Sequence, residues 1–332
     1  MKLLRLLVLL VVVLAAGAAG AALWWIERPL ELASPTVELS VEPGATPRTI
    51  ARQWVDAGVR TSPRLLYEWF RWSRQARNIR AGSYELTAGT TPRQLLDKMV
   101  RGDETLAYVR LLEGWTFEQL REALAKAEAL RPTTAAMSDA EVMTALGRPG
   151  VAPEGRFFPD TYAYNRGVSD LAVLERAHHA MQKRLEDVWA QRPADTPLRS
   201  ADEALILASI VEKETGLEAD RAKVAAVFLN RLRIGMPLQT DPTVIYGMGK
   251  AFDGNLRRPD LRRDTPFNTY TRRGLPPTPI AMPGKASLIA VVHPEDIEAL
   301  YFVSRGDGTS EFSSNLADHN RAVSRYQRGG RP

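Results

Sequence analysis

The stretch Asp202 to Thr215, DEALILASIVEKET, joins a mostly apolar run to two carboxylates near its end, Glu212 and Glu214. It contains neither Pro nor Gly, so it predicts a helix, and Gly216 predicts a left-handed stop directly after it. At about 100° per residue, Glu214 shares a narrow stripe with apolar residues, whereas Glu212 lies well away from that stripe. We therefore expect Glu214 on the buried face, in the last turn. The apolar members of its stripe are Leu207, Ile210 and Val211.

Burial of a carboxyl group raises its pKa, and a helix C-terminus also disfavours its negative charge. A glutamic acid that keeps its proton near neutral pH can donate that proton to the leaving oxygen of a glycosidic bond. Glu214 is therefore the candidate general acid. The alternative is that Glu214 pairs with a buried Arg and only stabilises its domain.

Composition limits the function classes. The 332 residues are enough for two domains, or for one domain with a large insertion. The net charge of +5 is spread along the chain without the basic runs of nucleic-acid binders, and suits an anionic polymer or a membrane surface.

The absence of Cys excludes disulfides and thiolate metal sites. No pair of the four histidines has the spacing of a zinc motif, so we expect no metal and no cofactor. The histidines are His178, His179, His293 and His319.

Residues Leu6 to Ile26 carry no charge, and a helix of 21 residues matches a bilayer core of roughly 30 Å. The basic residues in segment 1–5 predict a cytoplasmic N-terminus. Trp24 and Trp25 lie at the far end, where indole rings favour the membrane interface. We therefore expect a retained single-pass anchor over 6–26, with the following residues 27–36 as a short linker. A cleaved signal peptide is the alternative, because small residues between Ala15 and Ala22 offer cleavage sites.

A pattern of strand, Gly turn, Thr cap and helix occurs three times after the anchor. Its caps are Thr46, Thr91 and Thr116, the first two followed by Pro and the third by Gln119 at capping-box spacing. The first two units, with a helix between them, resemble a LysM module, which binds peptidoglycan glycan, over residues 36–103. A generic α+β spacer is the alternative.

The later part of the chain predicts helices separated by ordered loops, so the fold class is α+β. One loop, 153–162, is dense in Gly, Pro and aromatic residues, and 128–152 resembles a helical connection. The predicted helices are Ser169 to Trp189, Ala219 to Ile234, Ser287 to Val292 and Asn315 to Arg325, with short strands at Leu300 to Ser304 and Ser310 to Phe312. Two polar segments, 238–249 with a tight turn and the loop 265–280, are of the kind that lines a site.

Several motifs in this order resemble the endolytic murein transglycosylase (YceG-like) family. They are the segment Ala208 to Thr215, the segment Leu238 to Gly249, Asn268-Thr269-Tyr270 with Gly274 to Pro277, and His319-Asn320. The resemblance covers nearly the whole chain and implies a catalytic domain over 104–332 with a helix like that of soluble lytic transglycosylases. In that helix the catalytic Glu precedes a hydroxyl residue, which matches Glu214 and Thr215 rather than Glu212.

The resemblance implies a lyase of the cytoplasmic (inner) membrane whose catalytic domain is periplasmic. Such an enzyme cleaves nascent glycan strands between N-acetylmuramic acid and N-acetylglucosamine, leaves 1,6-anhydromuramyl ends and terminates elongation. Its expected partners are peptidoglycan strands and peptidoglycan synthases (penicillin-binding proteins). Candidate residues for substrate contact or for orienting Glu214 are Gln239, Thr240, Asp241, Tyr246, Asn268 and Tyr270.

Two other functions stay open on the sequence. A hydrolase of the lysozyme type would use Glu214 as acid and Asp241 as its partner carboxylate, although Asp241 before Pro242 also fits an Asx turn. A non-enzymatic scaffold would bind glycan and recruit synthases. A lyase needs no second carboxylate, because the C6 hydroxyl of the sugar, rather than water, attacks C1.

Overall fold

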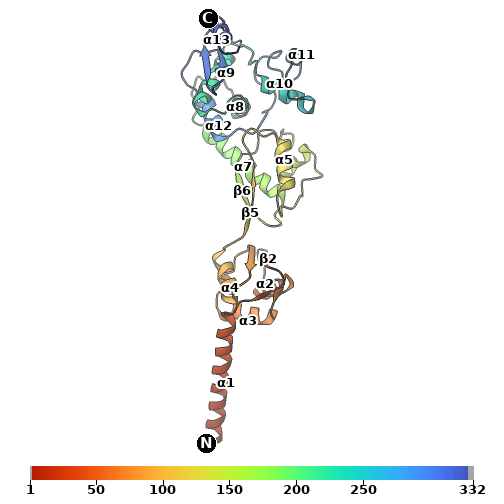
Figure 1. Cartoon of the computed structure of the whole chain (residues 1–332), viewed down its shortest axis with the longest axis vertical. Helices are drawn as coiled ribbons and strands as arrows, with labels where there is room; N and C mark the ends of the chain where they lie inside the picture. The colour runs from red at the N-terminus through yellow and green to blue at the C-terminus, as the bar shows by residue number, and fades with distance from the viewer. Residues whose placement is uncertain (1, 328–332) are drawn as a thin grey trace. The chain divides into compact units, whose positions relative to one another are not determined.

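The computed structural model describes residues 2–327 and has a mixed α+β fold (Figure 1). The chain forms two compact units. The first comprises Met1–Ala107 with Ala163–Val168, and the second comprises Tyr108–Tyr162 with Ser169–Pro332. The strands β5 (Leu106–Arg110) and β6 (Thr161–Asn165) form a two-stranded sheet, and the chain passes from one unit to the other within them.

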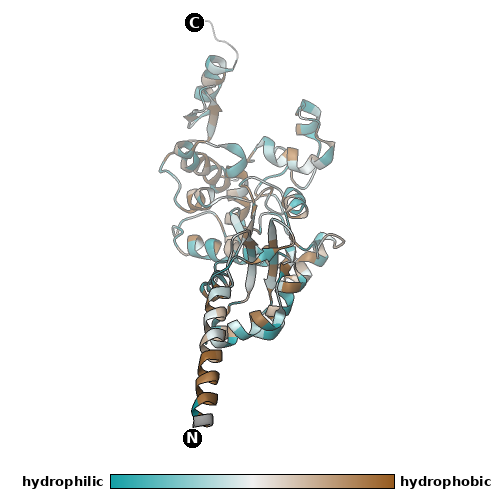
Figure 2. Cartoon of the chain, turned by 60° about the horizontal axis from the view of Figure 1, so that its bottom comes forward, coloured by the Kyte–Doolittle hydropathy of each residue, from teal (hydrophilic) through white to brown (hydrophobic). Residues whose placement is uncertain are grey.

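The first unit begins with the apolar helix α1 (Lys2–Ile26), whose window Leu4–Ile26 is long and apolar enough to cross a membrane (Figure 2). From Leu4 to Trp24 its side chains are exposed, whereas Trp25 packs against the core of the unit and Ile26 is buried in it. The expected linker 27–36 is not a free segment. Leu30 is buried, and its N–H donates to the carbonyl of Thr90. The polypeptide therefore enters the folded unit directly at the end of the helix.

The rest of the first unit has the predicted order of strand, helix, helix and strand, with additions. Its main sheet pairs β2 with β4 antiparallel, from Thr36 opposite Thr87 to Val41 opposite Gly82. A smaller sheet pairs β1 with β3. The elements are β1 (Glu31–Leu32), β2 (Thr36–Val41), α2 (Pro47–Asp56), β3 (Val59–Arg60), α3 (Pro63–Trp72), η1 (Ala76–Asn78), β4 (Gly82–Thr87) and α4 (Pro92–Arg101).

The core of the first unit is aromatic and aliphatic. Trp54, Phe70 and Tyr84 are almost completely buried, and burial of such side chains supplies the main driving force for folding a unit of this size. The predicted N-caps are present. Thr46 accepts a hydrogen bond from the N–H of Thr49, and Thr91 forms a capping box. These caps fix where α2 and α4 begin.

The second unit is mainly helical. Its elements are α5 (Phe117–Lys126), α6 (Asp139–Ala145), α7 (Asp170–Trp189), α8 (Ala201–Glu214), α9 (Glu218–Arg233), α10 (Asp241–Met248), η2 (Gly249–Ala251), α11 (Arg258–Arg262), α12 (Lys285–Val292), β7 (Tyr301–Ser304), β8 (Ser310–Ser313) and α13 (Leu316–Tyr326). The helix α8 contacts α7, α9, α10 and α12, and the β7–β8 hairpin contacts α13 (Figure 1). All residues from Ala204 to Val211 are buried, so α8 is the central helix of the unit.

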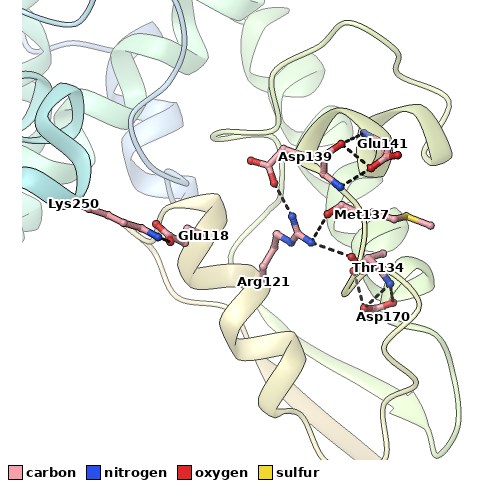
Figure 3. A network of polar contacts seen from close by, with 9 residues as sticks. Glu118, Arg121, Thr134, Met137, Asp139, Glu141, Asp170 and Lys250 are labelled. Atoms are coloured by element: carbon pink, nitrogen blue, oxygen red, sulfur yellow. Dashed lines mark hydrogen bonds and ion pairs between the residues drawn. The ribbon is translucent and has the colours of Figure 1, made fainter.

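A polar network holds the segment between α5 and α7 (Figure 3). The guanidinium of Arg121 donates to Asp139 and to the carbonyls of Thr134 and Met137. The buried carboxylate of Asp170, at the start of α7, accepts hydrogen bonds from the N–H and hydroxyl of Thr134. This segment was expected to be a helical connection, but within 128–152 only α6 is an α-helix, because side chains rather than a helical backbone satisfy the polar groups.

Two other expectations need correction. Segment 238–249 was predicted as a polar stretch with a tight turn, yet Asp241–Met248 form the helix α10, in which Pro242 occupies the first turn, where no N–H is needed. The predicted loop 153–162 is correct up to Asp160, after which β6 begins.

Candidate active site

A cavity of about 530 Å³ lies in the second unit at the C-terminal end of α8, and Glu214 is in its wall. Its lining comes from four regions of sequence: the ends of α8 and α9, segment 238–241, Tyr270, and the β7–α13 region. The lining residues are Glu214, Phe228, Arg231, Leu238, Gln239, Asp241, Tyr270, Tyr301, Phe302, Val303, Ser304, Leu316, His319, Asn320, Val323 and Gln327.

The end of α8 differs from the prediction. Gly216 does not adopt the expected left-handed conformation. Thr215 instead leaves the helix in an extended conformation, with φ −143°, and its hydroxyl accepts a hydrogen bond from the N–H of Leu217. This local bond turns the chain into α9 without a glycine stop. Glu214 is consequently the last helical residue and is half-buried.

Thr240 is the direct partner of Glu214. Its hydroxyl donates to Oε1 of Glu214 from a side chain that is 1% exposed. Burial raises the pKa of the Glu214 carboxyl above its ordinary value; the Thr240 hydrogen bond and the charge of Arg231 oppose this rise, and the charge of Asp241 adds to it. A protonated carboxyl group facing a polar cavity is what a general acid requires.

Arg231 is the buried arginine that could have paired with Glu214. No salt bridge between the two is found among the described residues, and two guanidinium nitrogens donate elsewhere: Nε to the carbonyl of Leu300 at 2.7 Å, and Nη1 to that of Leu238 at 2.6 Å. The purely structural alternative for Glu214 therefore lacks its expected partner. Arg231 instead ties α9 to β7 and to the segment that carries Thr240.

A group of buried threonines holds the Thr240 hydroxyl in place. The N–H of Thr240 donates to Oγ1 of Thr269 at 3.1 Å, and the hydroxyl of Thr243 donates to the carbonyl of Thr240 at 2.8 Å. Gln239, which precedes Thr240, has a positive φ of 50°, and its N–H donates to the carbonyl of Thr269. These contacts fasten segment 238–243 to the loop 265–280, so the two predicted polar segments meet beside Glu214.

Asp241 and Tyr270 form the second polar pair of the cavity. The hydroxyl of Tyr270 donates to Oδ1 of Asp241 at 2.6 Å. Burial and the neighbouring Asp241 carboxylate raise the pKa of Tyr270, so it keeps its proton and remains a hydrogen-bond donor. Gln239 completes the set of predicted residues that line the cavity. Four predicted residues, Gln239, Thr240, Asp241 and Tyr270, are thus brought to Glu214 or to its cavity.

Asn268 lies outside the cavity, although its residue type had pointed to substrate contact. Its fully buried amide donates to the carbonyls of Asp260, Leu261 and Arg263, and its Oδ1 accepts from the N–H of Tyr270. These bonds use both ends of the amide inside the protein. The geometry favours a positioning role for Asn268, since it holds the loop that presents Tyr270.

Tyr246 is also absent from the lining of the cavity. Its hydroxyl donates to Oε2 of Glu154 at 3.1 Å, and its ring packs edge-on against Phe267. Glu154 is 7% exposed and also accepts the N–H of Phe117 at the start of α5. Burial raises the pKa of Glu154 to about 7, against the effect of these hydrogen bonds. The sequence marked its Gly-, Pro- and aromatic-rich loop as ordered, but not this carboxylate.

Glu212, the competing carboxylate on α8, has a structural role. Its Oε2 accepts the N–H of Gly284 at 2.9 Å and the hydroxyl of Ser287 at 2.7 Å, at the N-terminus of α12. It is absent from the lining of the cavity. The two glutamates of α8 therefore face different surroundings.

The far wall of the cavity contains groups that the sequence did not single out for a role. The rings of His319 and Tyr301 stack with centroids 5.1 Å apart, and Arg231 lies over the Tyr301 ring. Burial and the charge of Arg231 lower the pKa of His319, which favours the neutral imidazole. The contact of β7 with α13 brings these residues into the cavity of Glu214, a placement that the motif His319-Asn320 did not reveal in the sequence.

Comparisons with known proteins agree with one another. The YceG-like family model matches residues 39–325. An endolytic murein transglycosylase of Bacillus subtilis (strain 168) is 30% identical over 308 residues, which cover 88% of this chain and 85% of the relative. One of Streptococcus pneumoniae (strain D39) is 25% identical over 295 residues, 79% of this chain but 53% of the relative, so this chain spans about half of that protein. The 2.6 Å crystal structure of a yceG-like protein of Listeria monocytogenes superposes with a TM-score of 0.54 at 27% identity, covering 86% of this chain and 98% of that one.

Proposed function

The chain belongs to the YceG-like family, and on this premise we propose that it is a lytic transglycosylase, a lyase that cleaves the glycan strands of peptidoglycan. The finer proposal is that it cuts internally between N-acetylmuramic acid and N-acetylglucosamine and leaves 1,6-anhydromuramyl ends, which terminates strand elongation. The observation that carries the proposal is the half-buried carboxyl of Glu214, which faces a polar cavity with its pKa raised.

In the proposed reaction Glu214 acts twice. Its protonated carboxyl donates to the glycosidic oxygen, the bond to the muramyl C1 breaks, and the leaving sugar departs as an alcohol. The carboxylate so formed accepts a hydrogen bond from Thr240, which stabilises it between the two steps. It then removes the proton of the C6 hydroxyl as that oxygen bonds to C1, which restores the protonated Glu214 and closes the anhydro ring.

The second carboxylate of the cavity favours a lyase over a hydrolase. Asp241 accepts a hydrogen bond from Tyr270 at 2.6 Å, so one of its oxygens is already engaged. A hydrolase would need Asp241 free to activate water or to attack C1, whereas the lyase needs no second carboxylate, because the C6 hydroxyl of the sugar attacks C1. We assign Asp241, with Tyr270 and Gln239, to substrate contact, and Thr240 to the orientation of Glu214.

The arrangement of the chain supports a proposal on where in the cell the protein acts. We propose that α1 is a single-pass anchor in the inner membrane, that residues 36–103 form a LysM-like glycan-binding module, and that residues 104–332 form the periplasmic catalytic domain. Peptidoglycan strands are then the substrate. Synthases that make those strands, the penicillin-binding proteins, are the expected partners.

The test is mass spectrometry of peptidoglycan digested by the full-length protein in detergent, as wild type, Glu214→Gln and Glu212→Gln. We expect anhydromuramyl ends from the wild type, a loss of about 10²–10⁴ in rate for Glu214→Gln, and a rate within a few-fold of wild type for Glu212→Gln. The Glu212 control makes the same chemical change two residues away, and the glutamine oxygen can still accept from Ser287.

Each contrary result has its own meaning. Hydrated reducing ends would establish a hydrolase, with Asp241 as the partner carboxylate. Absence of cleavage by the folded wild type would leave the glycan-binding scaffold. Full activity of Glu214→Gln would remove Glu214 from the chemistry.

A further inference from the structure

The helix α3 of the first unit carries an apolar stripe whose two ends, Leu65 and Trp72, its core leaves exposed. Leu65, Trp69 and Trp72 are spaced at i, i+4 and i+7, so they share one side of the helix. Leu65 is 50% exposed and Trp72 is 77% exposed. A neighbouring side of α3 serves the core, where Leu66 and Phe70 are fully buried. Trp69, between them, is partly buried and packs against the core, so the two ends of the stripe are free to meet something outside the unit.

Basic side chains border this stripe. Arg64 and Arg71 lie along one edge of it, each one residue before a member of the stripe. The segment 60–80 contains six Arg and one Glu, a net charge of +5, which equals the net charge of the whole chain. All six guanidinium side chains are exposed, and Arg71 pairs with Glu68. The exposed ends of the stripe thus lie in a locally basic part of the surface.

A chain of contacts places the stripe beside the end of the apolar helix α1. The indole N–H of Trp69 donates to the carbonyl of Pro92 at 3.0 Å, and the guanidinium of Arg93 lies 5.9 Å from the centre of a Trp69 ring. Arg93 in turn forms an ion pair of 2.5 Å with Glu27, the residue that follows α1. Figure 1 shows α3 beside this end of α1. Since Ile26 is buried in the same unit, the stripe is held at the point where α1 meets the folded unit.

We propose that this α3 face, Leu65, Trp69 and Trp72 with the basic side chains Arg64 and Arg71, binds the anionic lipid surface around the anchor. The proposal rests on the membrane anchor of the proposed function and not on its chemistry. Tryptophan rings favour the headgroup region, and leucine adds buried apolar area. Arginines at the edge of the stripe match anionic headgroups in charge and can donate to their phosphates. The other partner such rings suit is a sugar, but stacking on a sugar ring does not itself use the surrounding positive charge, and the position beside α1 favours lipid.

The absence of cysteine in the chain allows a direct test. Full-length Leu65→Cys and Trp72→Cys variants, each labelled with one polarity-sensitive fluorophore, are placed in nanodiscs of phosphatidylcholine with or without phosphatidylglycerol. Lipids carrying a headgroup-level quencher report contact. The control is Glu42→Cys, an exposed site directly after Val41, the last residue of β2. Thr36, with its partner Thr87, lies at the other end of that strand.

We expect quenching of the labels at 65 and 72 by more than about twofold, stronger with phosphatidylglycerol, and little quenching at 42. An added Arg64→Gln, Arg71→Gln pair should remove the dependence on phosphatidylglycerol. Equal quenching at 65, 72 and 42, or none at 65 and 72, would overturn the proposal. Protection of residue 72 by purified glycan strands but not by lipid would assign the face to sugar. Failure of the chain to co-elute with nanodiscs would refute the anchor and this proposal together, and cleavage assays would still judge the chemistry separately.

Discussion

The hydroxyl of Thr240 offers a quantitative test of the proposed chemistry, because it donates to the carboxyl expected to titrate. Thr240→Val exchanges that hydroxyl for a methyl group of similar size and leaves the backbone bonds of residue 240 in place. A hydrogen bond to a charged group is worth about 1.5–3 kcal/mol and favours the ionised Glu214. Since 1.36 kcal/mol corresponds to one pKa unit, its loss should raise the pKa of Glu214 by roughly one to two units.

The sign of the rate effect follows from the role of Glu214. A general acid must be protonated, so activity falls as pH rises through its pKa. The variant should therefore keep its activity to a pH about one to two units higher than the wild type. The assay is the rate of anhydromuramyl release, as kcat/KM, between about pH 5 and pH 9. Thr240→Ser, which retains a hydroxyl, should restore the wild-type profile. An alkaline limb that stays in place, or moves to lower pH, in a folded Thr240→Val protein would refute the reasoning.

Two further predictions concern the loop that begins at Pro153. Glu154, with its pKa raised to about 7, binds a proton more tightly in the folded chain than in the unfolded chain. The free energy of unfolding should therefore fall by about 3 kcal/mol from pH 4.5 to pH 7 and then level off. Glu154→Gln should flatten this pH dependence in denaturant titrations, and an unchanged pH dependence would contradict the assignment. Gly155→Ala should cost about 2–4 kcal/mol by the same assay, because φ is +74° and a Cβ would lie 2.4 Å from Pro279. The control Gly147→Ala, at φ +73° with open space around it, should lower the free energy of unfolding by only about 1–2 kcal/mol. Equal losses at both glycines would show that backbone strain, and not the clash with Pro279, sets the cost.

Local signals in the sequence predicted local structure well. The caps at Thr46, Thr91 and Thr116 were confirmed, because each depends on a hydroxyl and an N–H three residues apart. Long apolar or amphipathic helices such as α7 and α8 were also found where predicted. The helix α10 was missed, because Pro242 and Gly247 resemble turn residues. Burial of Thr243 and Val244 stabilises it, and burial is a tertiary effect.

The candidate site likewise combines a residue that the sequence predicts with partners that only the fold brings together. Residue type and helical position pointed to Glu214, and both can be read from the sequence without tertiary structure. The partners could not, since the Tyr270–Asp241 bond spans 29 residues and the Tyr246–Glu154 bond spans 92. Asn268 has the residue type of a ligand-binding group, yet its amide is fully used by nearby carbonyls. Only the folded loop reveals which polar groups are already satisfied.

The burial of Ile26 in the first unit has a consequence for how the protein meets its substrate. A domain on a flexible tether samples a hemisphere above its anchor, and its effective concentration there falls as the tether lengthens. Here the backbone bond from Leu30 to Thr90 forms four residues after the helix ends, so the first unit has almost no slack. With α1 in a bilayer, this unit diffuses with its anchor in two dimensions. On the proposed function, it therefore samples glycan in a thin layer next to the membrane.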